Sequence, residues 1–152
     1  MRLAEALMLR SDLQKRFISL RNRVGQNAVV QDGERSHESP QALMEQAEKV
    51  LEKLEELVYG INRANARHAL PDGRSLTQAV ARRDTLRQRH GLLSHAIESA
   101  QKAPSRYGMA EIRWVATVNV AELQKKADEL SQEIRELNAV IQECNWRVDL
   151  EQ

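Results

Sequence analysis

The sequence is poor in cysteine, proline, glycine and aromatic residues, and each shortage excludes a class of protein. Its 152 residues include one cysteine, three prolines, six glycines, two tryptophans, two tyrosines and one phenylalanine. A single cysteine, Cys144, excludes an internal disulfide framework and fits a reducing compartment. So few aromatic residues, glycines and prolines argue against an all-β fold and favour long helices.

Long hydrophobic runs are also missing. No stretch approaches the roughly 18 apolar residues that a membrane-spanning helix needs, and charges interrupt residues 1–10 too often for a secretory signal. We therefore expect a cytoplasmic protein with no transmembrane segment. The hydrophobic share of 41% is too high for a disordered chain.

Neither sign of charge is in excess. Lys and Arg number 23 against 22 Asp and Glu, which gives a formal net charge of +1. Proteins dedicated to nucleic acids or to membrane surfaces rely on surplus positive charge. The basic residues also lack interleaved aromatic residues on which bases could stack. We expect no nucleic-acid partner.

Apolar residues recur at steps of three and four over four segments, residues 2–24, 40–64, 75–100 and 119–148. This spacing is typical of amphipathic helices. Helices of similar length with broad apolar faces favour a mainly α fold, an antiparallel four-helix bundle within a single domain over residues 1–152.

Local signals mark where these helices begin and end. Gly25 predicts the end of the first helix and Pro104 that of the third. Three starts carry capping patterns, namely Ser39-Pro40, Ser75-x-x-Gln78 and Asn119-x-x-Glu122.

The helices differ in charge and in apolar width. The first and third are mainly basic and the second and fourth mainly acidic, so charge favours contacts between helices that are consecutive in the chain.

Apolar residues beyond one stripe predict a surface for self-association, and hence a homo-oligomer. They are Met44, Leu51 and Val58 on the second helix and Met8 and Leu9 on the first.

One segment has the pattern of a strand. Residues 111–118 alternate apolar and polar side chains with a period of two. Because a lone strand is not stable, partners are expected at residues 28–31 and around the Pro-Asp-Gly turn at 71–73. The sequence thus predicts a small β-sheet or hairpin at one end of the bundle.

Polar residues gather where the second and third helices approach their connecting turn. Their guanidinium and amide groups could hold an anion or a peptide carbonyl. The alternative is a structural network that fixes how the helices pack. This candidate cluster comprises Asn62, Asn65, Asp72, Arg83, Asp84, Arg87 and His90.

No pattern points to catalysis, a metal or a cofactor. The one Glu-x-x-His pair, Glu34 and His37, falls in a loop rather than on a helix, and one cysteine cannot build a Cys-rich zinc site. Cys144 lies on the apolar stripe of its helix, where cysteine commonly packs as a small hydrophobic residue. We predict no catalytic residues, no metal, no cofactor and no enzymatic activity.

The order of several short motifs resembles the septicolysin-like family of uncharacterised bacterial proteins over nearly the whole chain. The matching stretches are Leu3-Ala4-Glu5-Ala6-Leu7, Asp12-Leu13-Gln14-Lys15-Arg16, Ile61-Asn62-Arg63-Ala64-Asn65, Asp72-Gly73 with Leu76, Arg82-Arg83-Asp84-x-Leu86, Arg89-His90, Glu111-Ile112, Val120-Ala121-Glu122-Leu123-Gln124 and Asn145-Trp146.

The family name implies a membrane-active cytolysin, but the resemblance supplies no catalytic residue. Thiol-activated cytolysins carry a tryptophan-rich stretch after their cysteine, whereas here Cys144 is followed by Asn145-Trp146-Arg147. Three hypotheses remain. The first, which we favour, is a non-enzymatic protein that acts through protein–protein contacts, and the second is a cytolysin. The third is a small-ligand or anion binder, or a hydrolase-like enzyme, at the polar cluster.

Overall fold

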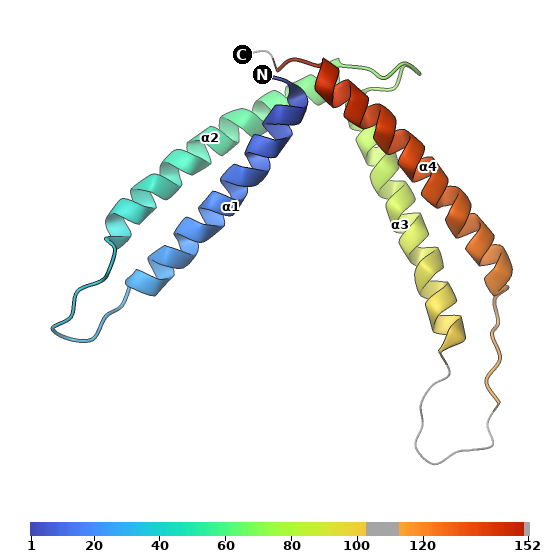
Figure 1. Ribbon diagram of the computed structural model, residues 1–152, viewed down its shortest axis with the longest axis horizontal. Coiled ribbons are helices and arrows are strands. Elements are labelled where there is room, and N and C mark those ends of the chain that lie inside the picture. The colour runs from blue at the N-terminus through green and yellow to red at the C-terminus, as the bar shows by residue number, and fades with distance from the viewer. Residues whose placement is uncertain (103–112, 151–152) are drawn as a thin grey trace. The chain divides into compact units, whose positions relative to one another are not determined.

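Helices dominate the chain wherever the structure describes it. The computed structural model describes residues 1–102 and 113–150. Helix α1 runs over Leu3–Asn27, α2 over Pro40–Arg67, α3 over Leu76–Gln101 and α4 over Val120–Arg147 (Figure 1). These bounds confirm the predicted mainly α fold with four long helices.

The three predicted capping patterns start helices as expected. In each, a side-chain oxygen accepts a hydrogen bond from a backbone N–H that has no partner within the helix. These bonds run from Ala42 N to Ser39 Oγ (3.3 Å), from Gln78 N to Ser75 Oγ (3.1 Å) and from Glu122 N to Asn119 Oδ1 (3.1 Å). At Ser75 the reciprocal bond to Gln78 completes a capping box.

The predicted end of the first helix at Gly25 is wrong, because α1 continues to Asn27. The side chain of Asn27 explains the extension. Its Nδ2 donates to Arg23 O at 2.9 Å, and its Oδ1 accepts from Glu38 N at 3.0 Å. Asn27 thereby ends the helix and holds the following loop, while Gly25 keeps a helical backbone. Pro104 lies outside the described residues.

Contacts divide the described chain into two compact units. Unit 1 contains Met1–Ala69 with residues 142–150, and unit 2 contains Leu70–Ile141. The packing of all four helices around one core stays a prediction, and so does a single domain over residues 1–152.

In unit 1, α1 and α2 form a helical hairpin (Figure 1). Leu20 of α1 packs with Leu43, Ala47 and Val50 of α2, and all four are nearly inaccessible to solvent. More partly buried apolar residues extend this core, namely Leu13, Phe17, Val24 and Leu54. These residues belong to the predicted apolar stripes of the two helices.

The two ends of the described chain meet in unit 1. Leu3 N donates to Val148 O and Leu150 N donates to Met1 O, both at 2.8 Å. Between them, Arg2 and Asp149 form an antiparallel β-bridge and an ion pair of 2.7 Å. We call this pairing of residues 1–3 with 148–150 the terminal bridge. No sequence pattern predicted it.

In unit 2, α3 and α4 are joined by an ion pair between Arg82 and Glu133 at 2.9 Å. This contact links a predicted basic helix to a predicted acidic one. The turn before α3 is confirmed, since Leu70 N donates to Arg74 O at 2.7 Å and Gly73 has a φ of +86°. Residues that have a Cβ rarely adopt a backbone conformation with so positive a φ.

The predicted small β-sheet is wrong for the described residues. Residues 113–118 and 28–31 form no strand, and residues 71–73 form a turn; residues 111–112 lie outside the described part. Trp114 is 52% exposed and Val115 is 70% exposed. A period of two stabilises a strand only when one face is buried against a neighbouring element, and here both faces remain accessible.

We expect the Ser75→Ala variant to lose about 1 kcal/mol of unfolding free energy, because the capping box of α3 loses its acceptor. Urea denaturation followed by circular dichroism measures the change. Thr77→Ala, at an exposed site two residues later, is the matched control and should change stability by no more than about 0.5 kcal/mol. Equal stability of both variants would contradict the assigned cap.

Candidate functional site

The predicted polar cluster is distributed over both units. Asn62 and Asn65 lie near the end of α2, in unit 1. The other five residues lie in unit 2, within α3 or in the turn before it. They are Asp72, Arg83, Asp84, Arg87 and His90.

Within unit 2 the charges of this cluster pair locally. Asp84 Oδ1 lies 3.1 Å from Arg83 Nη2 and 3.7 Å from Arg87 Nη1. Asp72 binds Arg74 at 2.5 Å, and this guanidinium lowers the pKa of the Asp72 carboxyl. His90 is half-buried two turns after Arg83. The predicted ligand-binding role of the seven residues stays a prediction.

Among the described residues, no group of three or more His, Cys, Asp or Glu side chains could hold a metal ion. The predicted absence of a metal, a cofactor and catalytic residues stays a prediction.

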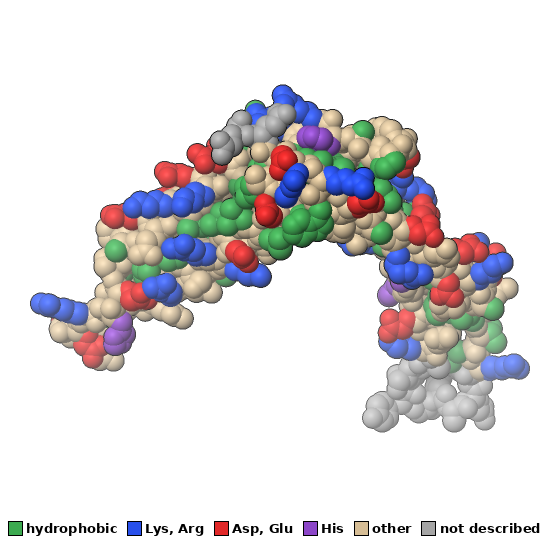
Figure 2. Space-filling model, turned by 45° about the horizontal axis from the view of Figure 1, so that its top comes forward, with side chains coloured by type: hydrophobic (Ala, Val, Ile, Leu, Met, Phe, Trp, Pro, Cys, Tyr) green, Lys and Arg blue, Asp and Glu red, His purple; other side chains and the backbone are tan. Residues whose placement is uncertain are grey.

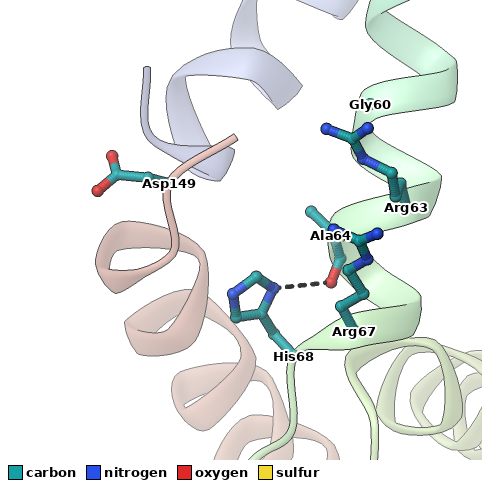
Figure 3. A pocket seen from close by; sticks show the side chains of 6 residues that line it. All are labelled: Gly60, Arg63, Ala64, Arg67, His68 and Asp149. Atoms are coloured by element: carbon teal, nitrogen blue, oxygen red, sulfur yellow. Dashed lines mark hydrogen bonds between the residues drawn. The ribbon is translucent and has the colours of Figure 1, made fainter. Parts of the chain in front are cut away.

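A shallow recess lies beside the end of α2, and Figure 3 shows the side chains around it. Arg63 and Arg67 come from successive turns of α2, and Asp149 comes from the segment after α4. His68 Nδ1 lies 3.0 Å from Ala64 O, so its ring is held against the helix end. The recess has no interior space for a ligand.

A larger groove of about 680 Å³ runs along one side of the α1–α2 hairpin. Its apolar lining is Met1, Leu9, Leu13, Leu57, Tyr59 and Leu150. Its charged lining is Arg16, Lys53, Glu56 and Arg63. Figure 2 shows hydrophobic side chains in a band along this hairpin, bordered by charged side chains.

The antiparallel register of the hairpin orders these residues along the groove. Because Leu20 packs with Ala47 and Val50, Arg16 lies opposite Lys53 and Leu9 lies opposite Gly60. Along the groove, residues 148–150 follow after Leu9 and Gly60. A Cβ on Gly60 would lie 3.0 Å from Leu150 Cδ2, so the absence of a side chain lets Leu150 pack directly on α2.

Sequence reasoning identified part of this groove. Leu9 belongs to the predicted surplus apolar surface, and Leu57 lies in the predicted amphipathic segment 40–64. Met1 and Leu150 could not be placed, because their positions depend on the terminal bridge between distant parts of the chain. The spacing of Arg16 and Lys53 carries a signal only once the hairpin register is known.

Cys144 is a free, half-buried thiol on the last part of α4. Burial raises its pKa above the ordinary value, and the opposing effect of Arg147 is smaller. Since the thiolate is the reactive form, this environment agrees with cysteine as a packing residue.

The comparisons with known proteins place the chain in a family. Residues 10–150 match the family of unknown function DUF6847, and the chain belongs to this family. A crystal structure of a functionally unknown conserved protein from Corynebacterium diphtheriae has 34% sequence identity and a TM-score of 0.91, covering 99% of each chain. Among curated proteins no match is found. The resemblance to the septicolysin-like family stays a prediction.

A search for membrane spans adds one finding. In the part of the chain that the structure describes, no helix has both the length and the apolar character needed to cross a bilayer.

We expect Cys144 to react severalfold more slowly with a disulfide reagent in the folded protein than in urea. Its raised pKa leaves less thiolate at neutral pH, and the difference should shrink as the pH rises above that pKa. Absorbance of the released thiol measures both rates, and Cys144→Ser provides the blank. Equal rates in the two states at neutral pH would contradict the burial of this thiol.

Proposed function

We propose that this protein acts through protein–protein contacts and associates with itself through an apolar stripe on α2. The stripe consists of Met44, Leu51 and Val58, and we call it the back stripe. Met44 is 44% exposed, Leu51 is 37% exposed and Val58 is half-buried. Exposed apolar residues in a continuous line are typical of a protein interface.

The back stripe is separate from both the hairpin core and the groove. Its members follow each other at seven-residue steps, which keeps them on one line of the helix. Leu57 and Gly60 face the groove, on the other side of the core line. The hairpin therefore has a second apolar face that α1 does not cover.

Charge favours a second copy as the occupant of this face. On α2, Glu48 and Glu55 flank the back stripe, whereas α1 presents Arg21 on the same side of the hairpin. In a two-fold arrangement, the face of one copy meets the same face of the other. Placing α1 against the partner's α2 brings basic side chains beside acidic ones.

The groove is a poorer self-association surface. In the same two-fold arrangement, with α1 against the partner's α2, two copies that met through their grooves would place Arg16 of each beside Lys53 of the other. Like charges at an interface oppose association. This contrast supports the back stripe as the contact.

The proposal involves no catalytic step, and it places the protein in the cytoplasm; both points follow the expectations from the sequence.

The back stripe can be covered in two ways. If the four helices of one chain share a core, as the sequence predicts, a monomer covers it. If two copies pair, the stripe is buried only in the dimer.

We expect Leu51→Glu to weaken self-association by at least about tenfold, or about 1.4 kcal/mol. The reason is that a carboxylate in the interface must lose its hydration. Sedimentation equilibrium from low to high micromolar concentration measures the effect. Leu92→Glu, a similar change at a 69% exposed site on α3, is the matched control and should leave association unchanged.

Two results would contradict this proposal. One is a wild-type protein that stays strictly monomeric at high micromolar concentration. The other is equal loss of association in Leu51→Glu and Leu92→Glu.

A further inference from the structure

Two cations face each other across one end of the groove. Arg16 of α1 and Lys53 of α2 both line it, and the hairpin register places them opposite one another. Neither takes part in any of the ion pairs found between described residues. Two unneutralised like charges repel, and an anion between them would relieve that repulsion.

At the other end of the groove, the terminal bridge supplies apolar lining. Met1 and Leu150 lie there, joined by the hydrogen bond of 2.8 Å in the terminal bridge. Leu150 packs against Gly60, so residues 148–150 form an end wall. Between the two ends, Leu9, Leu13 and Leu57 line the walls.

Two further charged residues, Glu56 and Arg63, line the groove. Glu56 lines the middle of the groove and repels an anion placed there. Arg63 is a third cation of the lining, toward the end where Leu150 lies, and its guanidinium lies 5.9 Å from the centre of the Tyr59 ring. Arg16 and Lys53 are two cations opposite each other, so an anionic group is most favourable between them.

The size of the groove is that of a small-molecule site. Its volume of about 680 Å³ falls within the range of small-molecule sites, about 300–1,000 Å³. The apolar residues along the groove, Leu9, Leu13 and Leu57, can pack against an extended hydrocarbon chain.

From these features we propose that the groove binds a single-chain anionic amphiphile, such as a long-chain carboxylate. The head group lies between Arg16 and Lys53, and the tail runs along Leu13 and Leu9 toward Leu150. Head groups with a phosphate or a sulfate share this chemistry. The site lies on the opposite side of the hairpin from the back stripe, so the inference goes beyond the proposed function.

Isothermal titration calorimetry with monomeric dodecanoate tests the proposal. We expect saturable binding of one dodecanoate per chain. Dodecyltrimethylammonium has the same chain and the opposite charge, and it should bind at least about tenfold more weakly. Dodecyl phosphate should bind like dodecanoate.

Two adjacent residues provide a matched pair of variants. Leu9 lines the groove and is 43% exposed, whereas Met8 is 53% exposed and does not line it. Leu9→Glu should weaken dodecanoate binding by at least about tenfold, and Met8→Glu should leave it unchanged. Both side chains are exposed enough for the hairpin to fold with glutamate, which circular dichroism checks.

The cation pair has its own test. In the double variant with Arg16→Gln and Lys53→Gln, dodecanoate should lose its advantage over dodecyltrimethylammonium. Leu51→Glu, which tests the back stripe, should bind dodecanoate like the wild type. A failure of self-association and a failure of amphiphile binding are therefore distinguishable.

Several results would overturn the proposal. They are the absence of saturable dodecanoate binding, equal binding of the two detergents of opposite charge, and equal effects of Leu9→Glu and Met8→Glu. Binding to anionic phospholipid vesicles, or to an acidic helical peptide, without binding of monomeric dodecanoate would also overturn it.

Discussion

The hydrophobic contact between α1 and α2 is the constraint on which the features of unit 1 depend. Leu20 packed against Ala47 and Val50 fixes the register of the hairpin. That register sets which residues face each other along the rest of both helices. It places Arg16 opposite Lys53 and separates the groove from the back stripe. A shift by one helical turn would rearrange the charges on both faces without changing either helix.

The two faces of the hairpin differ because α2 has apolar residues on both sides of its core line. One edge of its apolar surface forms a wall of the groove and the other edge is the back stripe. We propose that the charges give the faces different partners. The groove has the cations Arg16 and Lys53 at one end, whereas the proposed contact at the back stripe places its acidic residues beside basic residues of a second copy.

Features that depend on interactions between neighbouring residues could be predicted from the sequence. Features that depend on contacts between residues far apart in the chain could not. Ser75 and Gln78 predicted the start of α3 because a capping box involves neighbouring residues. The prediction that the first helix ends at Gly25 was wrong, because the end of α1 depends on the hydrogen bond between Asn27 and Glu38 across a loop. Residues 113–118 have the alternation of a strand but no neighbour to bury one face. In the candidate site, Leu9 was recognised as surplus apolar surface, whereas Met1 and Leu150 required knowledge of the terminal bridge.

The terminal bridge also bears on the order in which the protein can fold. The Arg2 side chain donates hydrogen bonds to the backbone oxygen of Arg147 and to the carboxylate of Asp149, which lie 145 and 147 residues further along the chain. During synthesis, α1 and α2 emerge before α3 and α4 and can pair early, but residues 148–150, which form the end wall of their groove, emerge only after all of unit 2. Contacts between such distant residues are slow to form because a long loop must close. Until then, the groove of the nascent hairpin lacks its end wall and exposes apolar side chains. The hairpin can therefore aggregate or bind chaperones throughout the synthesis of α3 and α4.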